Sequence, residues 1–584
     1  MARLLLSCGA VKRSPALVSV TLASLLAVHP GAAGGQRAVP DTLCAGRTVS
    51  RVDIQPSPPP FAGTAKKWQA AAHTVGLHHA TTNASVVAAF LSLVVGRQCT
   101  AFRRAESERV LRAQPFLADA TVRLVPDTGG TVAVVVSTTD EVPVLASVRF
   151  RGLAPESFSL GNGNIGGRAL RAEAHVERGR AYRTAIGGRI EEDVLLGHPF
   201  RLVLDADRYQ RGKRLGAELE HPFFTDLQRS SWHIGYESSS EYFGVERPSR
   251  EPLALGMTNR KWGASALLRT FGTHTVGLLG GAITGRRFEP AAAGIVIDDT
   301  GLRADTGVAL AGRFTPFRVS RIGALGGVRR VSFQSVNGFD ALVGSQDVMS
   351  GVAAGLFAGG GVSQFGERDI FLSSAMYAGV ATRNALLATL AAVEGRRDPS
   401  GGDWNSVIGS ARTALYWGSA PGAVLVVSDA ISGGLRSRLP LQVSFADRDG
   451  GLMGYRRSGL AGARRNIAHA ELRWSGESMM RRADVGFAAF SEVGTLWAGD
   501  APYGVNATRA TVGVSLLAAY PTRSKRLYRA DIGIPLTRSG DGMGRIEVRF
   551  SSADRTQGFW VEPEDVARAR TGTEPSRLFA WPTR

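Results

Sequence analysis

Two short segments of the chain alternate apolar and charged residues with a strict period of two. Residues 169–177 read Ala-Leu-Arg-Ala-Glu-Ala-His-Val-Glu, and residues 545–550 read Arg-Ile-Glu-Val-Arg-Phe. Successive side chains of a strand point to opposite faces, so each segment predicts a strand with one apolar and one charged face. In a soluble sandwich the apolar face would point inward, whereas in an outer-membrane barrel it would face lipid. We expect both segments to cross a membrane and to pair with each other where a barrel closes.

The same alternation recurs along residues 143–552, in segments of about ten residues separated by turns rich in Gly, Asp, Asn and Arg. Trp232, Ile234 and Tyr236 share one face, while His233 and Glu237 share the other. Charged faces on many consecutive strands conflict with a dry core but suit a wet lumen. A soluble propeller, the alternative, would show a repeat of about 40–50 residues, and none is found. The sequence therefore predicts an all-β transmembrane barrel of about 16 antiparallel strands.

A different pattern precedes the barrel. Residues 48–54 alternate as a strand, residues 65–112 have helical spacing, and residues 120–125 and 131–136 read as two further strands around a Gly-rich turn. This order of strand, helix, helix, strand and strand predicts a small α/β domain over residues 48–142.

The N-terminus has the features of a secretory signal peptide. Basic residues come first, residues 15–28 form a short apolar run, and small residues follow at 31–34. We expect a signal peptide over residues 1–34 and a polar lead over 35–47. The last predicted strand ends near residue 552, which leaves a tail over 553–584 in the periplasm or in the lumen.

Three cysteines are present, and Cys8 belongs to the predicted signal peptide. Cys44 and Cys99 then remain as an even pair in an oxidising compartment, which favours one disulfide over two unpaired thiols.

Composition narrows the function classes. The formal charge is +19, yet the 69 basic residues are spread along the chain, and only six of them are lysine. No basic stripe or recognisable reading module is found, so we expect no nucleic-acid partner. The mean hydropathy of −0.02 and the lack of a long apolar run give no sign of a transmembrane helix.

Catalytic motifs are weak or missing. Residues 161–166 match G-x-G-x-x-G, but a strand pattern follows where a nucleotide site needs a helix. The chain has no H-E-x-x-H, C-x-x-C or G-x-S-x-G motif. We therefore expect no enzyme, no cofactor and no metal site.

Several local sequences, in the right order, resemble the BamA/TamA superfamily of outer-membrane assembly and translocation proteins, also called bacterial surface antigens. The segments that carry the resemblance are residues 113–116, 158–167, 221–224, 450–459 and 491–494. The resemblance implies that the domain over 48–142 is a POTRA-like periplasmic domain in front of an outer-membrane barrel.

Residues 450–459 resemble the inward-folded loop of that family, whose motif is Val-Arg-Gly-Phe/Tyr. The residues of this loop that we assign to the motif or its neighbourhood are Gly451, Leu452, Met453, Gly454, Tyr455, Arg456, Arg457 and Gly459. Met453 stands where the family has an arginine, which the family buries against a carboxylate. We expect the loop to fold into the lumen and Arg456 or Arg457 to meet a wall carboxylate. The candidate wall partners are Glu471, Glu492 and Asp531.

The resemblance implies that the protein assists the insertion or passage of other proteins by pairing strands at a weak closure of the barrel. Its expected partners are outer-membrane lipids, unfolded or secreted clients, and a periplasmic partner bound through the POTRA-like domain. A passive pore or surface antigen that has lost this machinery is the alternative, and a lumenal enzyme is the weakest one.

Overall fold

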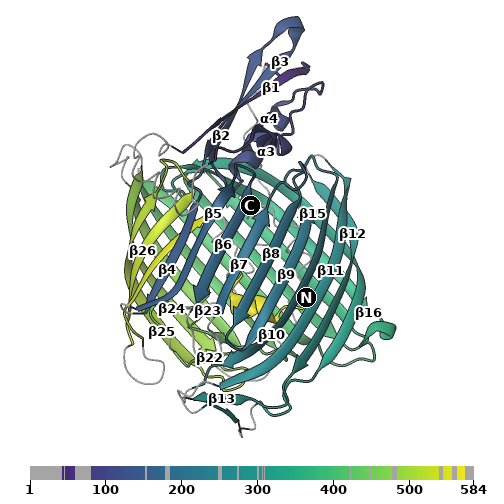
Figure 1. Cartoon of the computed structure of the whole chain (residues 1–584), viewed down its shortest axis with the longest axis vertical. Coiled ribbons are helices and arrows are strands. Elements are labelled where there is room, and N and C mark those ends of the chain that lie inside the picture. The colour runs from purple at the N-terminus through teal and green to yellow at the C-terminus, as the bar shows by residue number, and fades with distance from the viewer. Residues whose placement is uncertain are drawn as a thin grey trace. The chain divides into compact units, whose positions relative to one another are not determined.

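Figure 1 shows the chain as a computed structural model, which describes residues 43–44, 46–59, 80–151, 154–177, 185–247, 253–272, 275–298, 301–305, 307, 310–420, 422–446, 450–456, 458–475, 483–537, 544–554 and 562–571. The chain divides into two compact units, Met1–Pro40 and Asp41–Arg584, and all described residues belong to the second. The predicted signal peptide, most of the polar lead and Arg457 lie outside the described residues.

A closed antiparallel sheet makes up most of this unit. Of its 22 strands, β13 (Ile295–Asp298) and β14 (Gly301–Ala304) form a side hairpin next to β11, and β12 pairs directly with β15, which leaves 20 strands in the wall. The wall strands are β4 (Val144–Arg151), β5 (Ala154–Ile165), β6 (Leu170–Glu177), β7 (Ala185–Glu192), β8 (Arg201–Tyr209), β9 (Gly212–His221), β10 (Ser230–Val245), β11 (Leu253–Phe271), β12 (Val276–Pro290), β15 (Phe317–Asn337), β16 (Ser345–Gly361), β17 (Ile370–Ala381), β18 (Ala385–Arg397), β19 (Asn405–Ala420), β20 (Ala423–Leu435), β23 (Arg464–Ser475), β24 (Asp484–Trp497), β25 (Ala507–Ala519), β26 (Arg526–Pro535) and β27 (Glu547–Asp554).

The expected closed all-β barrel is confirmed, but the expected number of about 16 strands is wrong. A barrel of about 16 strands built from the same length of chain would have longer connections between its strands. Some connections of this barrel are short, so the chain crosses the wall more often. Strand β8 ends at Tyr209 and β9 begins at Gly212, so this hairpin has a two-residue loop.

The expected pairing of residues 169–177 with 545–550 is also wrong. The first segment forms β6, the third wall strand, which pairs with β5 and β7. The second overlaps β27, which pairs with β26 and with β4. Alternation assigns the faces of a strand but carries no information about its partner, which explains the error.

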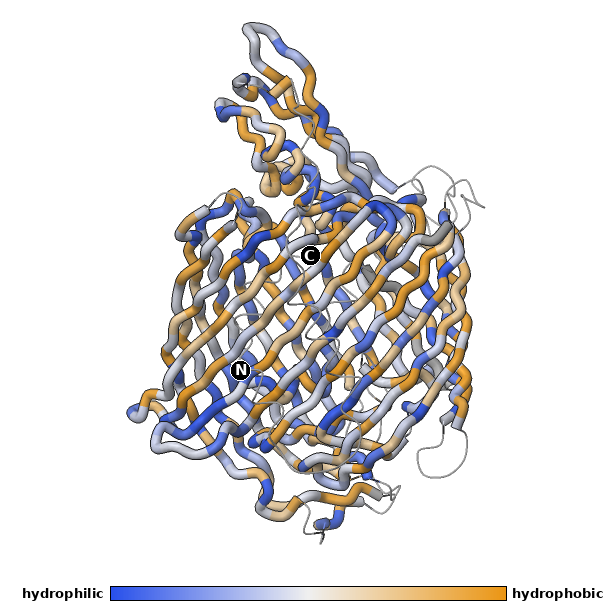
Figure 2. The backbone as a smooth tube through the Cα atoms, turned by 180° about the vertical axis from the view of Figure 1, so that it is seen from behind, coloured by the Kyte–Doolittle hydropathy of each residue, from blue (hydrophilic) through white to orange (hydrophobic). Residues whose placement is uncertain are grey.

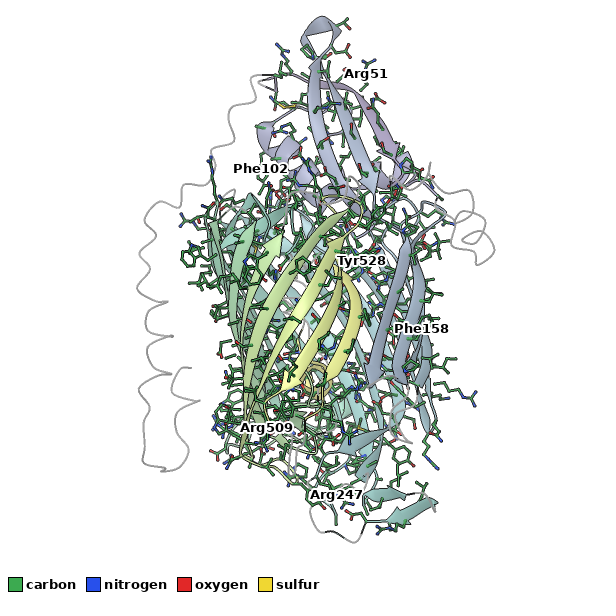
Figure 3. All side chains as sticks on the ribbon, turned by 90° about the vertical axis from the view of Figure 1, so that its left-hand side faces the viewer. Arg51, Phe102, Phe158, Arg247, Arg509 and Tyr528 are labelled. Carbon is green, nitrogen blue, oxygen red and sulfur yellow. A yellow bond between two sulfur atoms is a disulfide. The ribbon has the colours of Figure 1, made fainter. Side chains whose placement is uncertain are left out.

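The two faces of the wall have the expected polarity. On β10 the side chain of Ile234 is 55% exposed and that of its neighbour His233 is 4% exposed. On β26 the same contrast separates Ile532 from Asp531. Hydrophobic positions recur along the strands in Figure 2, and Phe158 is labelled on the outer side of the wall in Figure 3. The outward apolar side chains form the surface that lipid requires, and the polar side chains line the lumen.

An N-terminal module precedes the wall. Its elements are β1 (Val49–Ser57), α3 (Ala84–Ala89), α4 (Ala101–Arg112), β2 (Leu117–Pro126), the 3-10 turn η3 (Thr128–Gly130) and β3 (Val132–Asp140). The sheet order is β1-β3-β2, with β1 parallel and β2 antiparallel to β3. Val87 and Leu111 on the helices are fully buried together with Val134 on β3. A disulfide joins Cys44 to Cys99, whose Cα atoms lie 5.0 Å apart.

Helix α4 joins the module to the rim of the barrel. Arg112 forms a bidentate pair with Asp347 at the start of β16, with N–O distances of 3.0 and 2.9 Å. Arg109 pairs with Glu106 at 2.8 Å and donates to the carbonyl of Phe224 in the β9–β10 turn. Burial raises the pKa of Glu106, but the Arg109 pair and hydrogen bonds from Arg109 and Thr225 more than offset it, so the pKa lies below its usual value. The bidentate Arg112–Asp347 pair fixes the relative orientation of the two side chains as well as the distance between them.

Four shorter elements complete the list: η4 (Ser363–Phe365) after β16, the two-residue strands β21 (Val443–Ser444) and β22 (Ala461–Gly462), and α6 (Glu564–Ala569) after the last wall strand. In the part of the chain that the structure describes, every helix is too short or too polar to cross a bilayer.

A charge placed on the outer surface of the wall tests its contact with lipid. Val352 lies near the middle of β16 and is 54% exposed. We expect Val352→Arg to lower the free energy of unfolding by about 2–4 kcal/mol in lipid vesicles, because the guanidinium would enter hydrocarbon. Urea titration of the folded barrel measures this. Val352→Leu is the matched control, and equal stability of the two variants would contradict a lipid-facing position.

Removal of the disulfide tests how the module is held. We expect Cys44→Ser with Cys99→Ser to destabilise the module by about 2–4 kcal/mol, because the unfolded segment between the cysteines gains conformational freedom. The barrel should stay folded, because its strand ladders do not involve this bridge. Limited proteolysis with mass spectrometry reads the two parts separately. Loss of the barrel in this variant would show that the module is needed for barrel folding.

Candidate functional site

The ring closes at a seam between its first and last strands. Strands β4 and β27 pair over only two residue pairs, Arg149 with Arg549 and Val148 with Phe550. Among the other junctions between the 20 wall strands, the shortest ladder, between β5 and β6, has seven pairs, and the longest, between β15 and β16, has 17. Ladder hydrogen bonds and cross-strand pairs hold neighbouring strands together. The seam is therefore the junction at which the wall can separate while breaking the fewest hydrogen bonds.

The long connection between β20 and β23 folds back into the lumen. Tyr455 is fully buried, and Leu452 and Met453 are almost fully buried. The ring of Tyr455 lies 6.1 Å from that of Phe445, in an apolar cluster that also contains Leu496 from the wall. Residues 450–456 therefore pack against the inner face of the barrel.

Backbone groups of the loop bind carboxylates of the wall. The N–H of Met453 donates to Glu492 on β24 at 3.2 Å, and the N–H of Gly454 donates to Glu547 on β27 at 2.8 Å. In return, Thr511 on β25 donates to the carbonyl of Met453 at 2.7 Å. Three of the last four strands before the seam thus hold the loop.

Gly454 is required by its conformation. Its φ is +87°, and a Cβ there would lie 2.9 Å from the carbonyl oxygen of Arg545. That region is open to glycine and costly for other residues. The N–H of Arg545 donates to the carbonyl of Gly454 at 2.8 Å, so this point of the loop is bound in both directions.

The hydroxyl of Tyr455 completes this attachment. It donates to the carbonyl of Ala510 at 3.0 Å and accepts from the N–H of Thr537 at 3.1 Å. Both partners belong to the last strands of the ring or the turn that follows them. A buried tyrosine with its hydroxyl satisfied twice fixes the loop in one position.

Met453 offers no cation to the carboxylate of Glu492. Its side chain fills the space above Gly533, where a Cβ would lie 2.6 Å from Cγ of Met453. Glu492 instead pairs with His469, whose Nδ1 lies 3.2 Å from the carboxylate. The wall itself thus supplies a group that faces this carboxylate.

Arg456 reaches the other side of the seam. Its guanidinium lies 3.2 Å from the carboxylate of Glu177 on β6, two strands beyond β4. Gly454 meanwhile binds Glu547 on β27. The loop is thus attached on both sides of the seam, and we call residues 450–456 the seam brace.

The other predicted wall partners have wall partners of their own. Glu471 binds Arg473 at 2.5 Å and Arg529 at 2.8 Å. Asp531 accepts from Ser515 at 2.6 Å and also pairs with Arg529. Of the three carboxylates predicted to meet the loop, only Glu492 binds its described residues, through the backbone of Met453.

The sequence reasoning missed three groups of this site: Glu177, His469 and Glu547. All three stand on the charged face of an alternating segment, which is the signal that could have nominated them. Gly451 and Gly459 are half-buried in the same loop. Within the described ranges, no group of three or more His, Cys, Asp or Glu side chains is arranged to hold a metal.

A closed antiparallel ring with an apolar exterior, a charged lumen and an inward loop defines a β-barrel of the outer-membrane type. No family model and no curated protein matches the chain.

Among solved structures, the chain is similar to BamA from Haemophilus ducreyi lacking POTRA domains 1–3, with 9% identity, a TM-score of 0.38, and coverage of 87% of this chain and 84% of that one. It is also similar to CdiB from Escherichia coli (12%, 0.41, 87% and 77%) and to CdiB from Acinetobacter baumannii (9%, 0.35, 87% and 73%). BamA is one of the two proteins after which the resembled family is called.

Removal of the Arg456 side chain tests the seam brace. We expect Arg456→Ala to speed amide hydrogen exchange in β4 and β27 several-fold, because one side of the seam loses its attachment to the loop. Hydrogen exchange with mass spectrometry measures this in lipid nanodiscs. Arg287→Ala, which removes the exposed pair with Glu289 on β12, is the matched control. Equal exchange in the two variants would show that the loop does not stabilise the seam.

Proposed function

We propose that this protein assists the insertion or passage of other polypeptides at the outer membrane by opening the seam between β4 and β27. The observation that carries the proposal is the two-pair ladder at that seam. An opened seam presents two strand edges, and an extended client segment can add to such an edge by main-chain hydrogen bonds. Every other junction of the wall has at least seven residue pairs, so it would open at a higher cost.

The seam brace would control when the seam opens. It binds Glu547 on one side of the seam and Glu177 on the other, so the seam opens fully only when one attachment is released. The Arg456 pair is the one to release first, because it joins two half-exposed side chains, and such pairs contribute about 0–1 kcal/mol. The Gly454 side is held by buried backbone hydrogen bonds.

The N-terminal module fits the role of a POTRA-like domain that receives clients or a partner in the periplasm. Its element order is the one that the sequence predicts for such a domain, and β1 and β2 are the outer strands of its sheet. An outer strand offers an edge for pairing with an extended peptide. Lipids are the proposed partners of the apolar exterior. No covalent chemistry, cofactor or metal is part of the proposed function.

A passive pore or surface antigen is the second candidate. Met453 favours it, because this position lacks the arginine that the resembled family buries against a carboxylate. The two candidates differ in one respect: only an assembly or translocation factor needs its seam to open.

A cross-link across the seam separates the candidates. Val148 and Phe550 are partners in the β4–β27 ladder, and Cα atoms of such partners lie within the range that a disulfide spans. We expect the oxidised Val148→Cys/Phe550→Cys variant to lose most of its acceleration of client barrel folding into vesicles, and to regain it on reduction. The folding rate of a client in vesicles that contain the protein is the measurement.

The matched control is Phe158→Cys/Val176→Cys, which cross-links outward positions of β5 and β6 away from the seam. It should accelerate client folding as the unmodified protein does, in both redox states. Full activity of the seam-locked barrel, or no acceleration by the unmodified protein, would favour the passive barrel.

A further inference from the structure

The chain re-enters the lumen after its last strand. Strand β27 ends at Asp554, which pairs with Arg526 at the start of β26. Just before that start, Ser524 donates to Glu141 next to the module, so β27 ends at the end of the barrel to which the module is attached. The N–H of Thr571 donates to Glu394, which lies near the end of β18 that is farther from the module. Helix α6 accordingly lies within the ring of strands, drawn in yellow in Figure 1.

One charged group of the tail is held by the wall and the inward connection together. The carboxylate of Asp565 accepts from Arg465 at 2.8 and 3.2 Å and from the N–H of Ser444 at 3.4 Å. The side chain of Arg465 is 1% exposed, and this pair is bidentate. A buried arginine of this kind is a built receptor for one carboxylate.

A second set of contacts holds the end of the segment. Arg570 donates to Glu562 of the tail at 2.5 Å and to Ser410 on β19 at 3.1 Å. The carbonyl of Arg570 accepts from Arg286 on β12 at 2.5 Å, and the N–H of Thr571 donates to Glu394 on β18 at 2.5 Å. Both backbone and side chains of the tail are therefore bound by the wall.

The apolar face of α6 is buried. Val566 is fully buried and Ala569 nearly so, in the same apolar cluster as Leu452 and Tyr455 of the seam brace. The pair on the other face, Glu564 with Arg568, keeps side chains that are 49% and 45% exposed. The segment is thus seated with its apolar face buried and with the Glu564–Arg568 pair half-exposed.

From these contacts we infer that the lumen contains a peptide-binding site, and that the chain's own segment Glu562–Thr571 occupies it as a removable plug. The ligand class is a short helical peptide with a carboxylate and an arginine five positions apart and small apolar residues between them. Among the described tail residues, none pairs with a wall strand, so removal of the segment leaves every ladder intact. The inference holds for an assembly factor and for a passive pore alike.

The site is connected to the seam by the chain itself. Helix α6 is the next described element after β27, the strand that closes the seam, and its apolar face packs on the seam brace. A competing peptide in the site would therefore displace the tail and free one face of the brace.

The test uses the full-length protein in planar lipid bilayers. The double variant Asp565→Asn/Arg570→Ala removes two of the charged groups that the lumen binds, and Glu564→Gln/Arg568→Ala on the same helix is the matched control. We expect conductance to rise several-fold in the first variant and to stay at the wild-type level in the second. The heat-modifiable mobility of each protein in gels checks that the barrel is folded.

A synthetic peptide of residues 561–572 provides an independent readout. The fluorescently labelled peptide should bind the Asp565→Asn/Arg570→Ala protein at least tenfold more strongly than it binds the wild-type protein. The reason is that the tail of the variant no longer fills the site tightly. It should also return the conductance of that variant toward the wild-type value, whereas a peptide carrying the same two substitutions should not. Wild-type conductance in the folded variant would overturn the plug, and equal binding of the two peptides would overturn the site.

Discussion

In the apolar part of a bilayer, every backbone N–H and C=O has to find its hydrogen-bond partner within the protein. A sheet satisfies this condition only when it closes on itself, because an open edge in hydrocarbon costs several kcal/mol for each unsatisfied group. The 20 strands of this chain close in that way, with ladders of seven to 17 residue pairs around the ring and two at the seam. The rest of the structure is arranged around that one short ladder.

The lumen imposes a second physical constraint, because the charges buried there need partners. Its wall carries both signs of charge at close range, and Glu471, Arg473, Arg529 and Asp531 are paired with one another across β23 and β26. Buried charges persist when their partners are correctly placed, and deletion of a single partner would leave a costly unpaired ion. The seam brace and the tail enter this environment with matching groups, so polar recognition fixes what would otherwise be loose connections.

Brace, tail and seam are linked by covalent and packing contacts. The brace spans the two sides of the seam, the tail continues from β27, and Val566 packs in the same cluster as Tyr455. The brace and the tail are therefore both attached to the part of the wall that contains its shortest ladder.

The sequence by itself determined the faces of the strands, because alternation with a period of two is a local property that survives in any environment. It predicted the closed barrel and the order of elements in the module. It did not determine the strand number, since turn length is not written in the alternation, nor the partner of β27, since register depends on distant residues. Only the tertiary structure brought Arg456 to Glu177, which lies 279 positions earlier, and Asp565 to Arg465 inside the lumen. Those contacts join residues that are 279 and 100 positions apart in the chain, and no local pattern records such a contact.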